Sequence, residues 1–88
     1  MKLKENFALK QVANIWVVLP LAESTVDFKG MLKLNESGVL LWRVLEQGGD
    51  LKALVKALTD VYDVTEEIAA ADAEAFLETL KNAGCLEA

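Results

Sequence analysis

The sequence contains no histidine and only one cysteine, Cys85. Histidine is the usual proton shuttle near neutral pH and the commonest zinc ligand, so both kinds of site lack their main residue. A single cysteine excludes an internal disulfide and a cysteine metal cluster, and its thiol has no imidazole to activate it as a nucleophile. We therefore predict no enzyme activity, no metal and no cofactor, and interpret Cys85 as a small buried apolar residue.

Proline, glycine and long apolar runs are also scarce. The longest uncharged apolar run, residues 15–22, includes the single proline and is far shorter than the roughly 20 residues of a membrane-spanning helix. The five glycines form no phosphate-binding pattern. Residues 1–6 lack the apolar core and cleavage site of a signal peptide. These absences predict a cytoplasmic protein that contacts no membrane.

Charge is distributed unevenly along the chain. Residues 1–33 carry five lysines against three acidic residues, whereas residues 34–88 carry four basic residues against eleven acidic ones. The net charge of −5 therefore comes from the second part of the sequence, which argues against a phosphate-binding surface there.

The 88 residues predict a single domain over residues 1–88, whose first third is rich in strand-forming residues. We predict strands over Phe7–Val12, Ile15–Leu19 and Gly30–Leu34. The pair Ala13-Asn14 turns the first strand into the second. Pro20 either ends the second strand or occupies an unpaired position, because proline cannot donate to a strand ladder. Short links between the strands favour an antiparallel meander.

The remainder is predicted to be helical. Asn35, Asp50 and Thr65 are each placed to cap a helix, because their side chains can accept from the free amides of the first turn. The first helix is expected over about Glu36 to Gln47, ending at Gly48-Gly49, and the third is expected to end at Gly84. The fold class is therefore α+β: a winged-helix-like unit with a three-stranded antiparallel sheet followed by three helices.

Two residues of the third helix do not fit a simple amphipathic pattern. The spacing of Ile68, Phe76, Leu80 and Ala83 predicts the buried stripe, and Asp72 falls inside it. A buried carboxylate is costly unless it is paired. Asp72 is therefore expected either to pair with a neighbouring loop or to lie at the rim of a groove, holding a basic group or backbone amide of a partner. Leu77 lies at the edge of the stripe, where it either widens the core or lines such a groove.

In order and spacing, these residues resemble the PqqD-like family, small proteins of the pyrroloquinoline quinone pathway and their relatives in other peptide-modifying systems. The matching pattern covers residues 7–86. Its elements are Gly30, Leu34-Asn35, Ser37-Gly38, Trp42, Leu45, Gly48, Tyr62-Asp63-Val64, Asp72, Phe76-Leu77, Leu80 and Gly84-Cys85-Leu86. Residues 22–29 replace the family's tight glycine-rich hairpin, and Cys85-Leu86 replaces its double leucine, so the subfamily stays open.

The resemblance implies a recognition element for ribosomally made, post-translationally modified peptides. Such a domain binds the leader segment of a precursor peptide and presents it to a modifying enzyme, often a radical S-adenosylmethionine protein. An edge strand can accept an extended peptide as a further strand, with the third helix as the other wall of the groove. The residues expected to contact the peptide are Gly30, Met31, Leu32, Lys33, Leu34, Asp72, Ala73, Phe76 and Leu77.

Two other functions share this order of elements. One is a winged-helix DNA-binding regulator. The third helix argues against this function, because its acidic residues outnumber its single basic residue, Lys81, and would be repelled by phosphates. The other is a general protein–protein adaptor, including a homodimer paired through the open strand edge. Peptide recognition without nucleic-acid binding is the function that the sequence favours.

Overall fold

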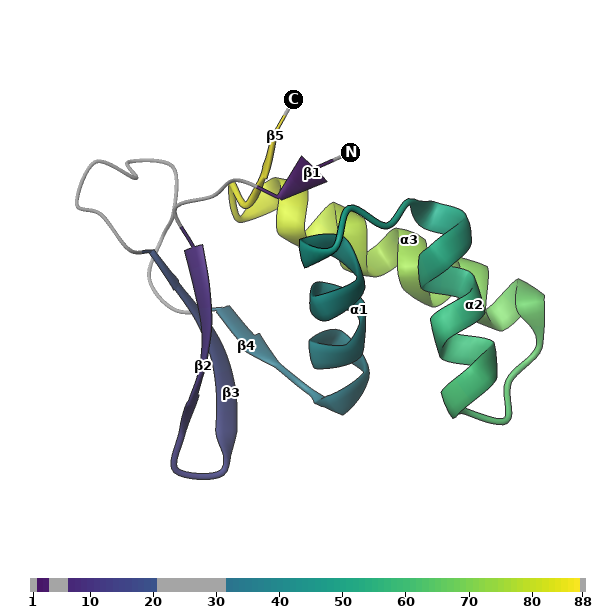
Figure 1. Ribbon diagram of the computed structural model, residues 1–88, viewed down its shortest axis with the longest axis horizontal. Helices are drawn as coiled ribbons and strands as arrows, with labels where there is room; N and C mark the ends of the chain where they lie inside the picture. Colours follow the sequence, from purple (N-terminus) through teal and green to yellow (C-terminus); the bar gives the residue numbers. More distant parts are fainter. Residues whose placement is uncertain (1, 4–6, 21–31, 88) are drawn as a thin grey trace.

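The computed structural model describes residues 2–3, 7–20 and 32–87. Three longer strands precede three helices, as predicted, and two very short strands lie at the two ends of the described chain (Figure 1). In chain order the elements are β1 (Lys2–Leu3), β2 (Phe7–Val12), β3 (Ile15–Pro20), β4 (Leu32–Leu34), α1 (Glu36–Glu46), α2 (Leu51–Val61), α3 (Glu66–Asn82) and β5 (Leu86–Glu87).

The main sheet has the strand order β2-β3-β4 and is antiparallel throughout. Ala13 and Asn14 form the turn between β2 and β3, and Ala13 has the left-handed φ of 55° that a tight turn often demands. Val17 in the central strand pairs with Lys10 on one side and Lys33 on the other. The predicted strands are confirmed where they are described, whereas Gly30 and Met31 lie outside the described residues.

A second pairing was not predicted from the sequence. Strand β1 pairs antiparallel with β5, with Leu3 opposite Leu86. Each strand has only two residues, too few for an alternating pattern to be recognised. The pair joins the two ends of the chain beside the C-terminus of α3 (Figure 1).

All three predicted helix caps are confirmed. The side chains of Asn35, Asp50 and Thr65 each accept from the backbone N–H three residues later. At the other ends, Gly48 and Gly84 have φ values of 83° and 80°, the left-handed conformation expected just after a helix. None of the described helices is both long and apolar enough to cross a membrane.

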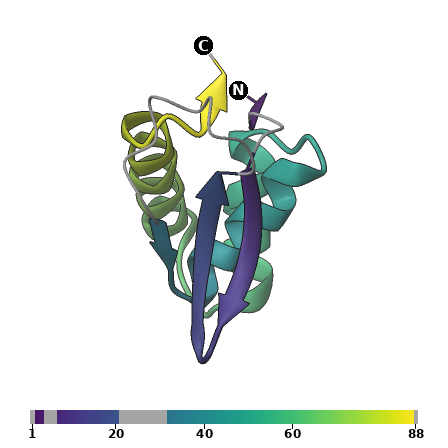
Figure 2. The same ribbon diagram turned by 90° about the vertical axis from the view of Figure 1, so that its left-hand side faces the viewer.

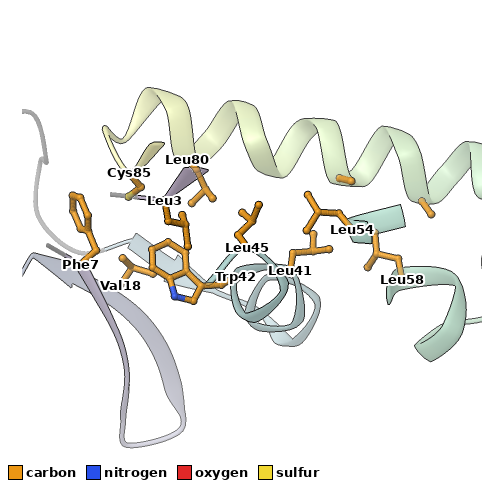
Figure 3. Close-up of a cluster of buried hydrophobic side chains, with 12 residues drawn as sticks. Leu3, Phe7, Val18, Leu41, Trp42, Leu45, Leu54, Leu58, Leu80 and Cys85 are labelled. Atoms are coloured by element: carbon orange, nitrogen blue, oxygen red, sulfur yellow. The ribbon is translucent and has the colours of Figure 1, made fainter. Parts of the chain in front are cut away.

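The core lies where the helices meet one another and one face of the sheet. In Figure 3, Leu80 of α3 points toward Leu45 of α1, while Leu54 of α2 and Val18 of β3 approach from opposite ends. Cys85 is fully buried in this cluster, as predicted. The buried members are Leu3, Phe7, Val18, Leu41, Trp42, Leu45, Leu54, Leu58, Ala69, Ala73, Leu80 and Cys85.

The predicted buried stripe of α3 is wrong at its N-terminal end. Ile68 is 52% exposed, whereas Ala69 and Ala73 are fully buried against α2. Alanine side chains let two helices approach closely, so α3 turns these small residues toward α2 rather than the bulkier Ile68. Asp72 is consequently exposed and lies beside the buried stripe rather than inside it.

Candidate functional site

Strand β4 forms one edge of the main sheet. It pairs with β3, and no other strand of the described chain pairs with its second side. Figure 2 shows β4 on the side of the sheet that α3 occupies, with β2 at the opposite edge. Leu32 and Leu34 are partly buried, while Lys33 between them is exposed. An edge of this kind presents backbone donors and acceptors that another extended chain can pair with.

A cavity of about 490 Å³ lies between β4 and α3. Lys33 and Leu34 form its wall on the sheet side, and Phe76 and Thr79 form its wall on α3. The turn of the β2–β3 hairpin and the start of α1 complete the lining, through Asn14, Ile15, Asn35 and Gly38. The free edge of β4 therefore borders a cavity that side chains of an added strand can enter.

Two smaller cavities continue from the first. The second, of about 310 Å³, shares Asn35, Gly38, Phe76 and Thr79 with the first. The third, of about 210 Å³, shares Ser37, Leu58 and Asp72 with the second. The three cavities together form one track, which we call the β4–α3 groove. Its lining residues are Asn14, Ile15, Lys33, Leu34, Asn35, Ser37, Gly38, Leu41, Leu58, Tyr62, Val64, Asp72, Ala75, Phe76 and Thr79.

The junction between β4 and α1 shapes the middle of the groove. Asn35 caps α1 by accepting from the Gly38 N–H at 2.9 Å, and the Ser37 hydroxyl donates to the same Asn35 oxygen at 3.0 Å. A Cβ added at Gly38 would lie 3.2 Å from both that oxygen and the Leu34 Cβ. Glycine therefore allows α1 to begin close against β4.

The groove carries little charge. Among the residues that the structure describes, Lys33 and Asp72 are the only charged ones that line it, and both are exposed. No ion pair joins Asp72 to another described residue. The groove therefore offers one cation near β4 and one carboxylate farther along α3, separated by apolar and uncharged polar side chains.

The structure gathers four of the nine residues predicted to contact a peptide. Lys33, Leu34, Asp72 and Phe76 line the groove, and Leu32 lies beside them on β4. By contrast, Ala73 is fully buried in the core, so it supports α3 from within instead of meeting a ligand.

The remaining predicted contacts lie elsewhere or cannot be placed. Leu77 is partly buried against the core and does not line the three cavities. It sits one residue, or about 100°, around the helix from Phe76, on the side away from Asp72. Gly30 and Met31 fall outside the described residues.

Several groove residues were missed from the sequence. Thr79 follows Phe76 by three positions and Asp72 by seven, so helical spacing already puts it on the same flank of α3. Asn35 was predicted as a helix cap and Gly38 belonged to the family pattern, but neither was predicted to line a ligand surface. Tyr62 and Val64 carried no such signal, because they reach the groove only through the packing of α2 on α3.

Metal ligands do not gather in the described part of the chain, where no group of three or more His, Cys, Asp or Glu side chains is close enough to hold an ion. The described groove offers backbone pairing at β4, apolar contact, the Lys33 cation and the Asp72 carboxylate.

A family model described as coenzyme PQQ synthesis protein D (PqqD) matches residues 16–86. This chain belongs to the PqqD family. The match includes β3 from Trp16 onward, β4 and all three helices, and thus all of the groove lining except Asn14 and Ile15. The resemblance noted in the sequence is thereby confirmed, and no curated protein sequence matches this PqqD-family chain.

Two solved structures resemble this PqqD-family chain. The first is TbiB1 in complex with the TbiA(beta) leader peptide, at 25% identity and a TM-score of 0.80, over 99% of this chain and 95% of that one. The second is a lasso peptide synthetase B1 complexed with the leader peptide, at 23% identity and a TM-score of 0.76, over 96% and 93% of the two chains. The α+β fold is therefore shared along almost the whole length.

Proposed function

We propose that this protein binds the leader segment of a ribosomally made precursor peptide along the free edge of β4 and presents it to a modifying enzyme. The observation that carries the proposal is the open edge of β4 beside a groove walled by α3. Further support comes from TbiB1, which shares this fold and is solved with a leader peptide. The modifying enzyme is a radical S-adenosylmethionine protein or another peptide-modifying enzyme.

Strand addition explains how varied leaders can be accepted. The backbone of an added strand pairs with β4 whatever its side chains are, and alternate side chains point into the groove. There they meet Leu34 and Phe76, which offer apolar contact, while Lys33 is exposed on the next position of the edge. Selectivity then comes from the side chains that enter the groove.

Backbone pairing alone is too weak for this function. Strand β4 has three residues, so an added strand gains about two or three hydrogen bonds, each with a net contribution of about 1 kcal/mol. A micromolar complex requires about 8 kcal/mol. Contacts in the groove must supply most of the difference and also offset the entropy lost when a disordered leader becomes ordered.

Binding to DNA is disfavoured by the surface of α3. The helix exposes Glu67, Glu74 and Glu78 on one flank, and Asp72 on another. A recognition helix with these carboxylates would be repelled by phosphates. We therefore propose a non-catalytic peptide-binding role with no nucleic acid, and a homodimer through a sheet edge would compete with the peptide for β4.

Proline substitutions in β4 test the proposal. In an antiparallel strand, successive N–H groups alternate between the paired side and the free side, so one of Leu32→Pro and Lys33→Pro removes an outward donor. The probe is a fluorescein-labelled peptide of about 15 residues, roughly 50 Å when extended, selected from a random library on the unmodified protein. The extended peptide is therefore longer than the longest dimension of the molecule, 40 Å, and can span the whole groove.

We expect the proline variant that stays folded by circular dichroism to lose peptide binding, measured by fluorescence anisotropy. Lys10→Pro is the control, because Lys10 pairs with Val17 from the opposite edge, as Lys33 does from β4. If folded β4 variants bound the peptide as tightly as Lys10→Pro, the peptide would not add to β4 and the proposal would fail.

A further inference from the structure

The β4–α3 groove continues beyond the end of β4. Its far end is the cavity of about 210 Å³, which we call the distal pocket. Its lining residues are Ser37, Leu58, Tyr62, Val64 and Asp72. None of them belongs to the sheet, so a peptide that only paired with β4 would leave this pocket empty.

The walls of the distal pocket are held by backbone hydrogen bonds. The Tyr62 N–H donates to the Leu58 carbonyl at 2.8 Å, and the Val64 N–H donates to the Tyr62 carbonyl at 3.0 Å. Thr65 then caps α3. The segment between α2 and α3 is therefore anchored at both ends, and the pocket is preformed before a ligand arrives.

The volume of the pocket suits one side chain. A cavity of about 150 Å³ in another protein binds benzene. Pockets for drug-sized molecules occupy about 300–1,000 Å³. The volume of about 210 Å³ thus exceeds the space for one aromatic ring and falls short of a small-molecule site.

The chemistry of the pocket is apolar with one negative charge at its rim. Leu58 is 3% exposed and forms the floor, and Tyr62 and Val64 are partly buried beside it. Asp72 is exposed and forms no ion pair with another described residue. An apolar side chain can fill the pocket while a neighbouring cationic side chain meets Asp72.

Helical spacing fixes the distance between the distal pocket and the β4 edge. Thr79 lines the cavity beside β4, and Asp72 lines the distal pocket. Seven residues along an α-helix span about 10 Å. An extended peptide covers that length with about three residues.

We propose that the distal pocket is a second recognition subsite for the bound peptide. It takes a bulky apolar side chain with lysine or arginine next to it, about three residues from the segment that pairs with β4. All pairings in the main sheet are antiparallel, and an antiparallel peptide would run from the Leu34 end of β4 toward the Leu32 end. The subsite residue therefore precedes the paired segment. This inference rests on the proposed function.

The test compares matched variants of the protein with the selected peptide. Val64→Ala and Asp72→Asn alter the pocket, and Val61→Ala and Asp63→Asn are their controls on nearby exposed residues that do not line it. The selected peptides should share an apolar residue beside lysine or arginine before the paired segment. Replacing that apolar residue by alanine should weaken binding to the unmodified protein about tenfold, and less in Val64→Ala.

The charge of Asp72 gives a separate readout. Asp72→Asn should weaken binding of the peptide about threefold at low salt, and should have no effect when the neighbouring basic residue of the peptide is glutamine. The Asp63→Asn control should bind as the unmodified protein does in both cases.

The outcomes separate the subsite from the proposed function. One outcome would overturn the subsite and leave the proposed function intact. In it, proline in β4 abolishes binding, but binding is unchanged by alanine at the apolar position of the peptide and by Val64→Ala or Asp72→Asn in the protein. Peptides that need the distal pocket but ignore proline in β4 would overturn strand addition, and with it the proposed spacing of the subsite from a paired segment. Binding that responds to neither set of variants would overturn both.

Discussion

Phe76 and Leu77 are neighbours in the sequence, yet the structure gives them different surroundings. Phe76 lines the two larger cavities of the groove, whereas Leu77 packs against the core away from them. We predict that Phe76→Ala weakens peptide binding and that Leu77→Ala does not, although both substitutions lower stability.

The expected loss for Phe76→Ala follows from the area that a peptide can cover. Phe76 is partly buried, so a bound peptide covers only the exposed part of its ring. If that part is about 50 Å², a quarter of the roughly 200 Å² that a phenylalanine can bury, its contribution at about 25 cal/mol per Å² is about 1.2 kcal/mol. This corresponds to about an eightfold rise in Kd.

Leu77→Ala should instead act on folding. Truncation of a buried leucine costs about 2–5 kcal/mol, and a partly buried leucine should fall near the lower end, at about 2 kcal/mol. The dissociation constant of the folded variant should change by less than about twofold.

Two measurements separate the effects. Urea unfolding followed by circular dichroism gives the free energy of unfolding, and anisotropy of the labelled peptide gives Kd under conditions where each variant is folded. If folded Leu77→Ala lost as much affinity as Phe76→Ala, the peptide would have to contact the core-facing flank of α3, and our placement of the groove would be refuted.

The remaining predictions concern the loop after α1 and the role of the whole protein. A Cβ at Gly49 would lie 2.5 Å from Val44 Cγ1, so Gly49→Ala should lower the free energy of unfolding by about 3 kcal/mol through overpacking. A Cβ at Gly48 would meet no atom, so Gly48→Ala should lower the free energy of unfolding by only about 1 kcal/mol, because of the φ of 83°. If urea unfolding showed a larger loss for Gly48→Ala than for Gly49→Ala, this account would be wrong. Added to its modifying enzyme, the protein should accelerate modification of the full-length precursor by raising its effective concentration. Mass spectrometry measures the modification. If modification of a leaderless precursor were accelerated equally, the protein would instead activate the modifying enzyme allosterically.

Local features of the fold could be predicted because they depend on neighbouring residues. Asn35, Asp50 and Thr65 each satisfy amides three residues away, so the sequence contains all the groups that define the helix starts. The hairpin at Ala13-Asn14 is similarly local, since its two strands adjoin the turn. Neither inference requires knowledge of what packs against these elements.

The orientation of α3 could not be predicted in the same way. A periodicity argument gives weight to bulky residues such as Ile68, whereas the contact with α2 uses Ala69 and Ala73. Leu80 belongs to both stripes, and the replacement of Ile68 by Ala69 and Ala73 turns the centre of the buried stripe by about 55° around the helix. That rotation moves Asp72 from the predicted buried stripe to the exposed rim of the groove.

The same rotation separates two flanks of α3 with different chemistry. Asp72 and Phe76 face the groove, while Glu67, Glu74 and Glu78 lie on the far flank. Most of the acidic side chains of α3 therefore lie outside the groove. The net charge of −5 therefore opposes binding to phosphates without making the groove strongly acidic. Since Lys33 and Asp72 are the only charged residues among its described lining, the groove must select its ligand mainly by apolar fit.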